Sequence, residues 1–229
     1  LSDFIRMELA LAGFTEIIPL ILCSHDENFA HLRKADSGQE AVILANPKTV
    51  EYQVVRTSLL PGVLKSIHHN RKHALPIKVF EVSDVVFKDV TQERCARNER
   101  HVCVAFCGKT SGFEVIHGIL DRLMQMLAVP LLTGASATAS QHKGYFIREA
   151  ADNSTYFPGR CADIYLSAPK APSAAEPQPH FTEIAPQDTQ GPNVLQTVGT
   201  FGIVHPEVLK NFEISYPVSV LEFNLEPFL

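Results

Sequence analysis

The sequence predicts an α+β fold in which an antiparallel sheet is flanked by helices. Several segments rich in Val, Ile and Phe alternate apolar with polar residues, which is typical of β-strands. Fewer segments show the spacing of an amphipathic helix. A chain of 229 residues is long enough to bury one large core. We therefore expect residues 1–229 to form a single domain.

The N-terminal part is predicted to be a helix followed by strands. Ser2 can cap the helix, and Gly13 can end it in the left-handed conformation. Residues 14–23 are then predicted as a strand. Ser24–Glu27 has the pattern of a capping box before a short helix, and residues 41–45 are expected to form another strand.

A second helix is predicted to begin near Leu59. Thr57 and Ser58 can accept hydrogen bonds from free backbone N–H groups, and Pro61 fits the first turn because its missing N–H costs nothing there. The apolar stripe of this helix is formed by Leu60, Val63, Leu64 and Ile67.

The rest of the chain is predicted to be mainly strand. Ile77–Lys88 and His101–Cys107 flank a polar turn and should form an antiparallel hairpin. Residues 113–127 carry a helical stripe, and Pro206 fits the first turn of a short helix. Further strands are expected at residues 144–148, 160–166, 197–204 and 218–225, with a tight turn at 157–160 before the second of these.

Residues 167–196 are predicted to be a flexible Pro-rich insertion. They hold six of the 15 prolines and lack both helical and strand periodicity. A long surface loop between paired strands costs little stability, because loop-closure entropy grows slowly with length. The insertion is either a spacer or a docking segment.

Composition limits the classes of function. A net charge of -5 gives no overall attraction to polyanions, and no run of about 18 apolar residues predicts a membrane span. Five cysteines without disulfide spacing fit a reducing cytoplasm. Since the sequence begins without Met, we expect it to be part of a longer polypeptide.

A set of motifs resembles one known family. The pattern N-P-x(8)-R-T-S-L-L-P-G-x-L-K begins at Asn46, and N-R-K and P-x-K-x-F-E-V-S-D follow it. It resembles the β subunit of phenylalanyl-tRNA synthetase of the archaeal and eukaryotic cytosolic type. Similar segments, in family order, are GFTEIIPLILCS, GFEVIHGILDRLMQML, YFPGRCADIYL, VGTFGIVHPEVLKNFEI and PVSVLEFNLEPFL. The resemblance implies the antiparallel fold of class II synthetases.

This resemblance also implies a partner. In the family, an (αβ)2 heterotetramer charges tRNA with phenylalanine, and the α subunit binds ATP and Mg2+. The segment at Gly13 resembles the first class-defining motif, which serves as a subunit interface. We therefore expect Phe14, Ile17, Pro19 and Ile21 to contact the α subunit.

The arginines that grip ATP in class II enzymes are missing from their expected places. The strand ending at Phe87 is followed by Lys88, which lacks the planar fork of a guanidinium group. No arginine follows Arg160, so the third class-defining motif cannot occur in its usual order. The sequence therefore predicts no catalytic, cofactor-binding or metal site in this domain.

Two alternatives stay open. One is a self-sufficient adenylate-forming enzyme that uses Lys88 and Arg160 for phosphates. The other is a tRNA-binding module, because Lys65, Arg71 and Lys72 belong to a dense basic cluster that could contact phosphates without reading sequence. A solvated helix face would account equally well for that cluster.

Overall fold

The computed structural model describes residues 1–133, 143–169 and 193–229. Its helices are α1 (Ser2–Leu11), α2 (His25–Asn28), α3 (Leu60–His69), α4 (Phe113–Met126) and α6 (Pro206–Asn211), with 3-10 turns η1 (Ala30–Leu32), η2 (Val50–Tyr52) and η3 (Glu226–Phe228). Its strands are β1 (Thr15–Glu16), β2 (Leu22–Cys23), β3 (Val54–Val55), β4 (Ile77–Lys88), β5 (Ala96–Cys107), β6 (Gly144–Glu149), β7 (Tyr156–Pro169), β8 (Asn193–Val204) and β9 (Val218–Asn224).

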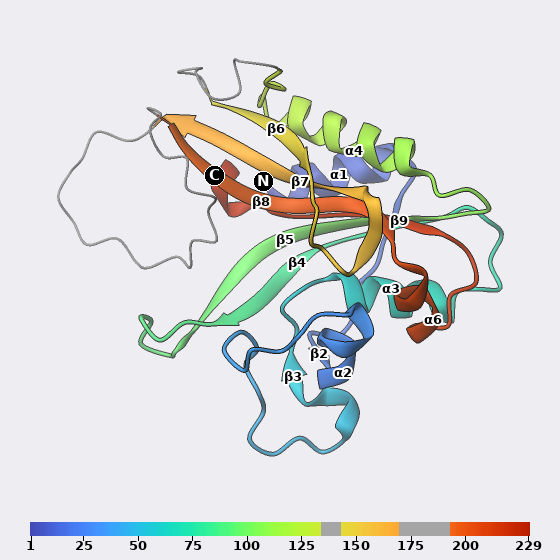
Figure 1. Cartoon of the computed structure of the whole chain (residues 1–229), viewed down its shortest axis with the longest axis vertical. Coiled ribbons are helices and arrows are strands. Elements are labelled where there is room, and N and C mark those ends of the chain that lie inside the picture. Colours follow the sequence, from blue (N-terminus) through green and yellow to red (C-terminus); the bar gives the residue numbers. More distant parts are fainter. Residues whose placement is uncertain (134–142, 170–192) are drawn as a thin grey trace.

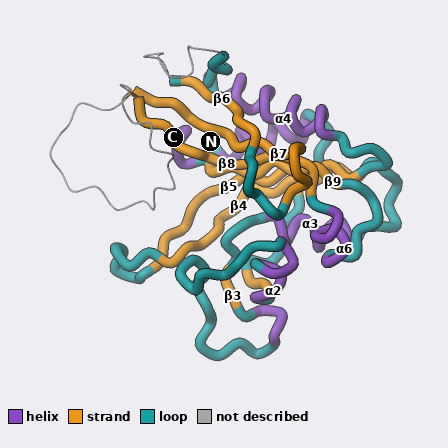
Figure 2. Tube along the Cα trace, viewed as in Figure 1, coloured by secondary structure: helices purple, strands orange, loops and turns teal. Residues whose placement is uncertain are grey.

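The main sheet has the strand order β1-β4-β5-β9-β8-β7-β6. All its pairings are antiparallel except that of β1 with β4. A smaller sheet pairs β2 with β3 in a lobe rich in loops, which Figure 2 shows below the main sheet. The predicted α+β architecture, an antiparallel sheet flanked by helices, is confirmed.

Helices cover the two faces of the sheet differently (Figure 1). On one face, α1 and α4 pack against buried side chains such as Phe80, Val104 and Leu221. On the other face, α3 and α6 pack against residues that include Val79 and Val220. Because side chains alternate along a strand, each strand supplies residues to both layers.

The end of α1 follows from Gly13. This residue has φ +81°, and its N–H donates to the carbonyl of Ala10 while the N–H of Phe14 donates to that of Leu9. The arrangement is a Schellman motif, as the glycine predicted. The predicted cap at Ser2 is wrong: Leu1 is the N-cap, and Ser2 is the first helical residue.

The predicted strand at residues 14–23 is wrong as one continuous element. β1 joins the main sheet and β2 joins the small sheet, with Pro19 between them. Proline cannot donate to a strand ladder, so the chain leaves the sheet there. The strand expected at residues 41–45 is also wrong, because only an isolated bridge between Ile43 and Val54 forms.

Two strands begin earlier than predicted. β5 starts at Ala96, where polar residues pair across the hairpin: Arg100 forms an ion pair with Asp84 at 2.5 Å. β7 starts at Tyr156, so the turn predicted at 157–160 is instead an irregularity within the strand. There Gly159 has φ +69°, which suits a bulge.

The insertion predicted at residues 167–196 is wrong at both ends of its range, which are strand. Residues 167–169 pair with residues 193–195 in the β7–β8 ladder. Residues 170–192, which carry the rest of that prediction, lie outside the described residues. The capping box at Ser24 and the helix opening with Pro206 are both confirmed.

Candidate functional site

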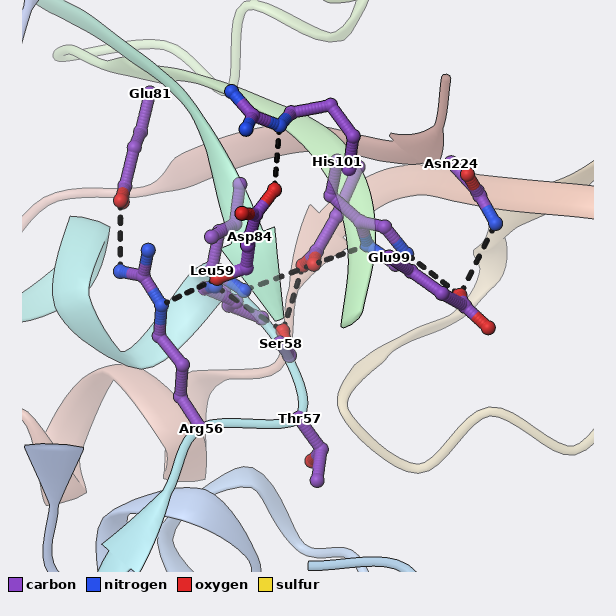
Figure 3. Close-up of polar contacts among 12 residues, drawn as sticks. Arg56, Thr57, Ser58, Leu59, Glu81, Asp84, Glu99, His101 and Asn224 are labelled. Atoms are coloured by element: carbon purple, nitrogen blue, oxygen red, sulfur yellow. Dashed lines mark hydrogen bonds and ion pairs between the residues drawn. The ribbon is translucent and has the colours of Figure 1, made fainter. Parts of the chain in front are cut away.

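The N-terminus of α3 is held by a carboxylate from a distant strand (Figure 3). Ser58 Oγ donates to Glu222 Oε2 at 2.7 Å, and the N–H of Leu59 donates to Glu222 Oε1 at 2.9 Å. Ser58 Oγ also accepts from the N–H of Leu60. The prediction that Ser58 accepts a hydrogen bond from a free backbone N–H is thus confirmed, while the N-cap residue of α3 is Leu59. Thr57 Oγ1 instead accepts from Asn28 Nδ2.

Glu222 continues into a chain of polar contacts. His101 Nδ1 lies 3.2 Å from Glu222 Oε1, and its Nε2 lies 3.2 Å from Glu99 Oε2. Asn224 Nδ2 donates to the same Glu99 oxygen at 3.1 Å. Burial raises the pKa of Glu222, but hydrogen bonds and the charge of His101, together with hydrogen bonds from Ser58 and Leu59, hold it below its ordinary value.

Arg56 and Glu81 form a second buried contact, near the start of α3. Arg56 Nη1 lies 2.7 Å from Glu81 Oε1, and both side chains are only 2% exposed. Arg56 Nε donates to the carbonyl of Asp84. The Nη atoms and both carboxylate oxygens lack a well-aligned hydrogen bond among the described residues. Burial raises the pKa of Glu81 to about 7, against the lowering effect of Arg56.

Strand register places the polar side chains of this face in one row. Cα pairing runs, strand by strand, through Glu81, Cys103, Glu222, Thr200, Asp163 and Arg148. Thr200 Oγ1 donates to Asp163 Oδ1 at 2.8 Å. We call this set the acidic row, because it contains three carboxyl groups and one guanidinium group. A triphosphate is bound by fixed cations, and the row itself supplies one.

The residues proposed for an adenylate-forming enzyme lie far apart. Lys88, at the end of β4, donates to the carbonyl of Gly38. Arg160 is on β7, which lies four strand spacings from β4 in the sheet. Along the strand direction, Arg160 lies next to the register row that contains Val79 of β4. Val79 is nine residues from Lys88 on the same strand. These separations are about 19 Å across the sheet and about 30 Å along it. The two side chains cannot grip one nucleotide, so this alternative is wrong in its choice of residues.

Two arginines on β5 were not considered from the sequence. Arg97 forms an ion pair with Glu99 and lies over the ring of Phe87, 5.3 Å from its centroid. Arg100 forms the ion pair with Asp84. Both guanidinium groups therefore already have carboxylate partners.

The predicted α-subunit contacts have different surroundings. Phe14 is buried in the core with Ile5 and Leu9, so it is not available on the surface. Ile17 is half-buried, and Pro19 packs so closely on α3 that a Cβ at Gly62 would lie 2.8 Å from it. Of the four predicted residues, Ile21 is exposed.

Other apolar side chains near this segment, which the interface prediction covered only as neighbouring apolar positions without naming them, are exposed. Ile18 is 89% exposed, and Leu20 follows it. On α1, Phe4, Met7 and Leu11 are spaced so that they share one helix face. The sequence signal for this surface was a second apolar stripe on the same helix, on the side opposite its buried residues. We call Phe4, Met7, Leu11, Ile18, Leu20 and Ile21 the apolar surface; each is more than half exposed.

The predicted basic cluster is divided. Lys65 forms an ion pair with Glu27 at 2.8 Å. Arg71 lies 3.8 Å from Glu213, which is a weak contact between exposed groups. Lys72 is exposed. Lys65 is thus engaged within the domain, while the cations just beyond α3 face solvent.

Comparison with solved structures gives the class of fold. Pyrrolysyl tRNA synthetase PylSc of Desulfitobacterium hafniense is similar with a TM-score of 0.64 and 10% identity, over 99% of this chain and 66% of that one. The chain therefore has the fold of class II tRNA synthetases.

Sequence comparison then identifies the family. The model of the phenylalanyl tRNA synthetase beta chain CLM domain matches residues 1–225. The Schizosaccharomyces pombe phenylalanine–tRNA ligase beta subunit is 49% identical over 98% of this chain and 34% of its own length. The cytoplasmic beta subunit of Arabidopsis thaliana is 38% identical over 100% of this chain and 34% of its own length. The chain belongs to this family, as its motifs predicted, and spans about a third of these relatives.

Within the described ranges, the helices are too short or too polar to pass through a bilayer.

Proposed function

We propose that this chain is a non-catalytic domain of a phenylalanine–tRNA ligase β subunit, which packs against the α subunit and positions the α active site. The (αβ)2 holoenzyme would act in the cytoplasm and charge tRNA with phenylalanine. ATP and Mg2+ would be bound by the α subunit, with no cofactor in this domain. The names of the relatives support the enzyme and the β-subunit role.

The apolar surface is the observation that carries the assembly role. Its residues lie on α1 and on the segment after β1, and an ion pair between Arg6 and Glu16 joins α1 to β1. β1 is the edge strand of the main sheet, with exposed residues. Exposed apolar side chains that gather in one part of a chain favour a protein–protein contact there, because leaving them in water is unfavourable.

The acidic row supports a non-catalytic role. Glu222 and Asp163 occupy the middle of the sheet face, whereas Arg56 is engaged with Glu81 and Arg148 lies on the edge strand β6. Electrostatic stabilisation of a transferring phosphoryl group needs the opposite charge. We therefore infer that this face preserves the fold and the position of α3 rather than adenylate chemistry.

The test is co-purification with the α subunit, followed by aminoacylation by the complex. Ile18→Asp should prevent co-purification and therefore abolish aminoacylation. Val90→Asp is the matched control, because Val90 is 87% exposed at a hairpin tip away from the apolar surface. Equal binding of α by both variants, or unaffected complex formation by Ile18→Asp, would refute the assembly role.

Calorimetric titration of this chain with ATP tests the non-catalytic role separately. We expect no binding at micromolar concentrations. Binding that Lys88→Ala abolishes would restore the adenylate-forming alternative.

A further inference from the structure

We propose that the groove formed by α6, the loop after it and Arg71, just beyond the end of α3, binds an unpaired segment of RNA, with phosphates at Arg71 and Lys210 and a base stacked on Tyr216. The inference goes beyond assembly with the α subunit, because the groove shares no residue with the apolar surface. Figure 1 shows α3 and α6 on the same side of the main sheet, and the chain just beyond α3 meets the loop after α6 where Arg71 lies 3.8 Å from Glu213.

The groove has a volume of about 690 Å3, within the range of pockets that hold small ligands. Its lining residues are Arg71, Pro206, Leu209, Lys210, Glu213, Ile214, Ser215, Tyr216 and Pro217. They combine two cations, one exposed aromatic ring and two prolines. Sites for single-stranded nucleic acid need this combination, with cations for the backbone and flat side chains for the bases.

The walls of the groove are held in place before any ligand arrives. The N–H groups of Glu213 and Ile214 donate to the carbonyls of Lys210 and Leu209, which folds the loop back onto α6. The N–H of Gly108 donates to the carbonyl of Pro217 and anchors the far end of the same loop. A pre-formed groove loses little entropy when it binds.

Charge distinguishes this groove from the rest of the chain. The chain has a net charge of -5, yet the groove has two cations and one carboxylate. That carboxylate, Glu213, is 74% exposed and 3.8 Å from Arg71, so solvent screens its neutralising effect. Lys72 adds an exposed positive charge beside Arg71. Local attraction for a polyanion is therefore expected here, in contrast to the acidic row.

The side chain of Tyr216 favours RNA over a partner that is anionic but has no bases. Its ring is 43% exposed. An acidic peptide would need the cations alone, whereas an unpaired base gains from stacking on the ring. The duplex form of the same RNA would offer phosphates but no free base.

The test measures binding of a labelled single-stranded RNA of about 12 nucleotides as a function of salt concentration. The Arg71→Ala/Lys210→Ala variant should lower the slope of log K against log salt by about 1.4, since each lost phosphate contact contributes about 0.7 for a single strand. The matched control is Lys48→Ala/Arg94→Ala, which removes one lysine and one arginine that are exposed on other loops. The control should keep the wild-type slope.

Tyr216→Ala should weaken binding about 5- to 100-fold, while Tyr216→Phe should bind within about twofold of wild type. The duplex should bind more weakly and be insensitive to Tyr216→Ala. Absence of binding by wild type, an unchanged slope in the groove variant, or the same slope change in the control would overturn the proposal. So would equal binding by the two Tyr216 variants, or a polyglutamate peptide that binds as tightly as the RNA. All substituted side chains are exposed, so thermal melts should match wild type.

Discussion

The two faces of the main sheet are built from the same strands but stabilised differently. The face under α1 and α4 is a continuous apolar layer, to which β9 contributes Leu221 and Phe223. The other face is apolar only under α3 and α6, and the next residue of β9, Glu222, joins a polar network there. The first face is stabilised mainly by burial, with few polar contacts such as the hydrogen bond that Tyr145 donates to Asp121 on α4. The second depends on hydrogen bonds and charges that join segments far apart in the chain.

The difference teaches which contacts hold α3 in place. The loop before α3 reaches the sheet through Arg56 and Ser58, and these meet Glu81 and Glu222. Burying a polar group without a hydrogen-bond or charge partner costs free energy. Removing one partner therefore leaves the other buried and unpaired, which destabilises the fold. We therefore expect this face to respond more strongly to charge changes than to changes in volume.

Arg56→Ala should have the largest effect, a loss of about 3–5 kcal/mol in the free energy of unfolding at about pH 8. The substitution leaves Glu81 buried without its counter-charge, and it empties the space of a side chain that is 2% exposed. Urea denaturation measures the loss. Arg71→Ala, at an exposed arginine, should change stability by less than about 0.5 kcal/mol. Similar small losses in both variants would show that the buried pair contributes little.

Glu222→Ala should cost about 2–4 kcal/mol, because Ser58, the N–H of Leu59 and His101 all lose an acceptor. Glu222→Gln keeps the shape and one acceptor, and should lose less. Chemical denaturation of both variants provides the comparison. If the glutamine variant is as unstable as the alanine variant, the negative charge, rather than the hydrogen bonds, is what matters.

The pH dependence should distinguish the two buried carboxyl groups. The pKa of Glu81 is raised to about 7 in the folded state, so its contribution is present below the unfolded pKa and is lost as pH rises toward 7. Wild type should therefore lose about 1–3 kcal/mol relative to Glu81→Gln between about pH 5 and pH 8. The pKa of Glu222 is lowered, so the stability that it contributes is lost only as pH falls below the ordinary pKa of a glutamate and through the folded-state pKa. This loss should be equal in wild type and in Glu81→Gln. A difference between the proteins that does not change with pH would contradict this assignment.

Gly199→Ala should cost about 1–3 kcal/mol through crowding on the apolar face. The added Cβ would lie 2.2 Å from Phe223 Cβ and 2.3 Å from the carbonyl oxygen of Glu222, and backbone atoms cannot move aside. Gly118→Ala is the control of opposite sign. It lies within α4 with nothing within 4 Å of the new Cβ, so it should stabilise by about 0.5–1 kcal/mol. Thermal melts that shift in the same direction for both would refute the packing argument.

Local patterns predicted the helices and most of the strands. The stripe in α4, the Schellman glycine at Gly13 and the capping box at Ser24 depend on neighbours within a few residues, so the sequence was sufficient for them. Predictions were wrong where the secondary structure of a segment depends on residues that pair with it from another strand, rather than on its neighbours along the chain. The first residues of β5 are polar, and they form strand because Asp84 and Phe87 face them across the hairpin.

The candidate sites divide in the same way. The family and the class of fold followed from collinear motifs. The absence of arginine after Arg160 was read directly from the sequence. The interface prediction included Phe14, which the core takes instead. The polar network was not predicted, although a single acidic residue within the apolar strand VSVLEFN was a signal for it.

The sequence by itself determined the periodicity of the longer helices, the end of α1 at Gly13, the capping box at Ser24, the family and the absence of arginine after Arg160. These properties reside in residue types and short spacings. Only the tertiary structure decided which strand carries the partner of Ser58, that Arg56 is buried against Glu81, and that Lys88 and Arg160 lie apart. The physical reason is that pairing between strands sets the relative positions of residues far apart in the chain, 164 positions for Ser58 and Glu222, and no local pattern encodes those distances.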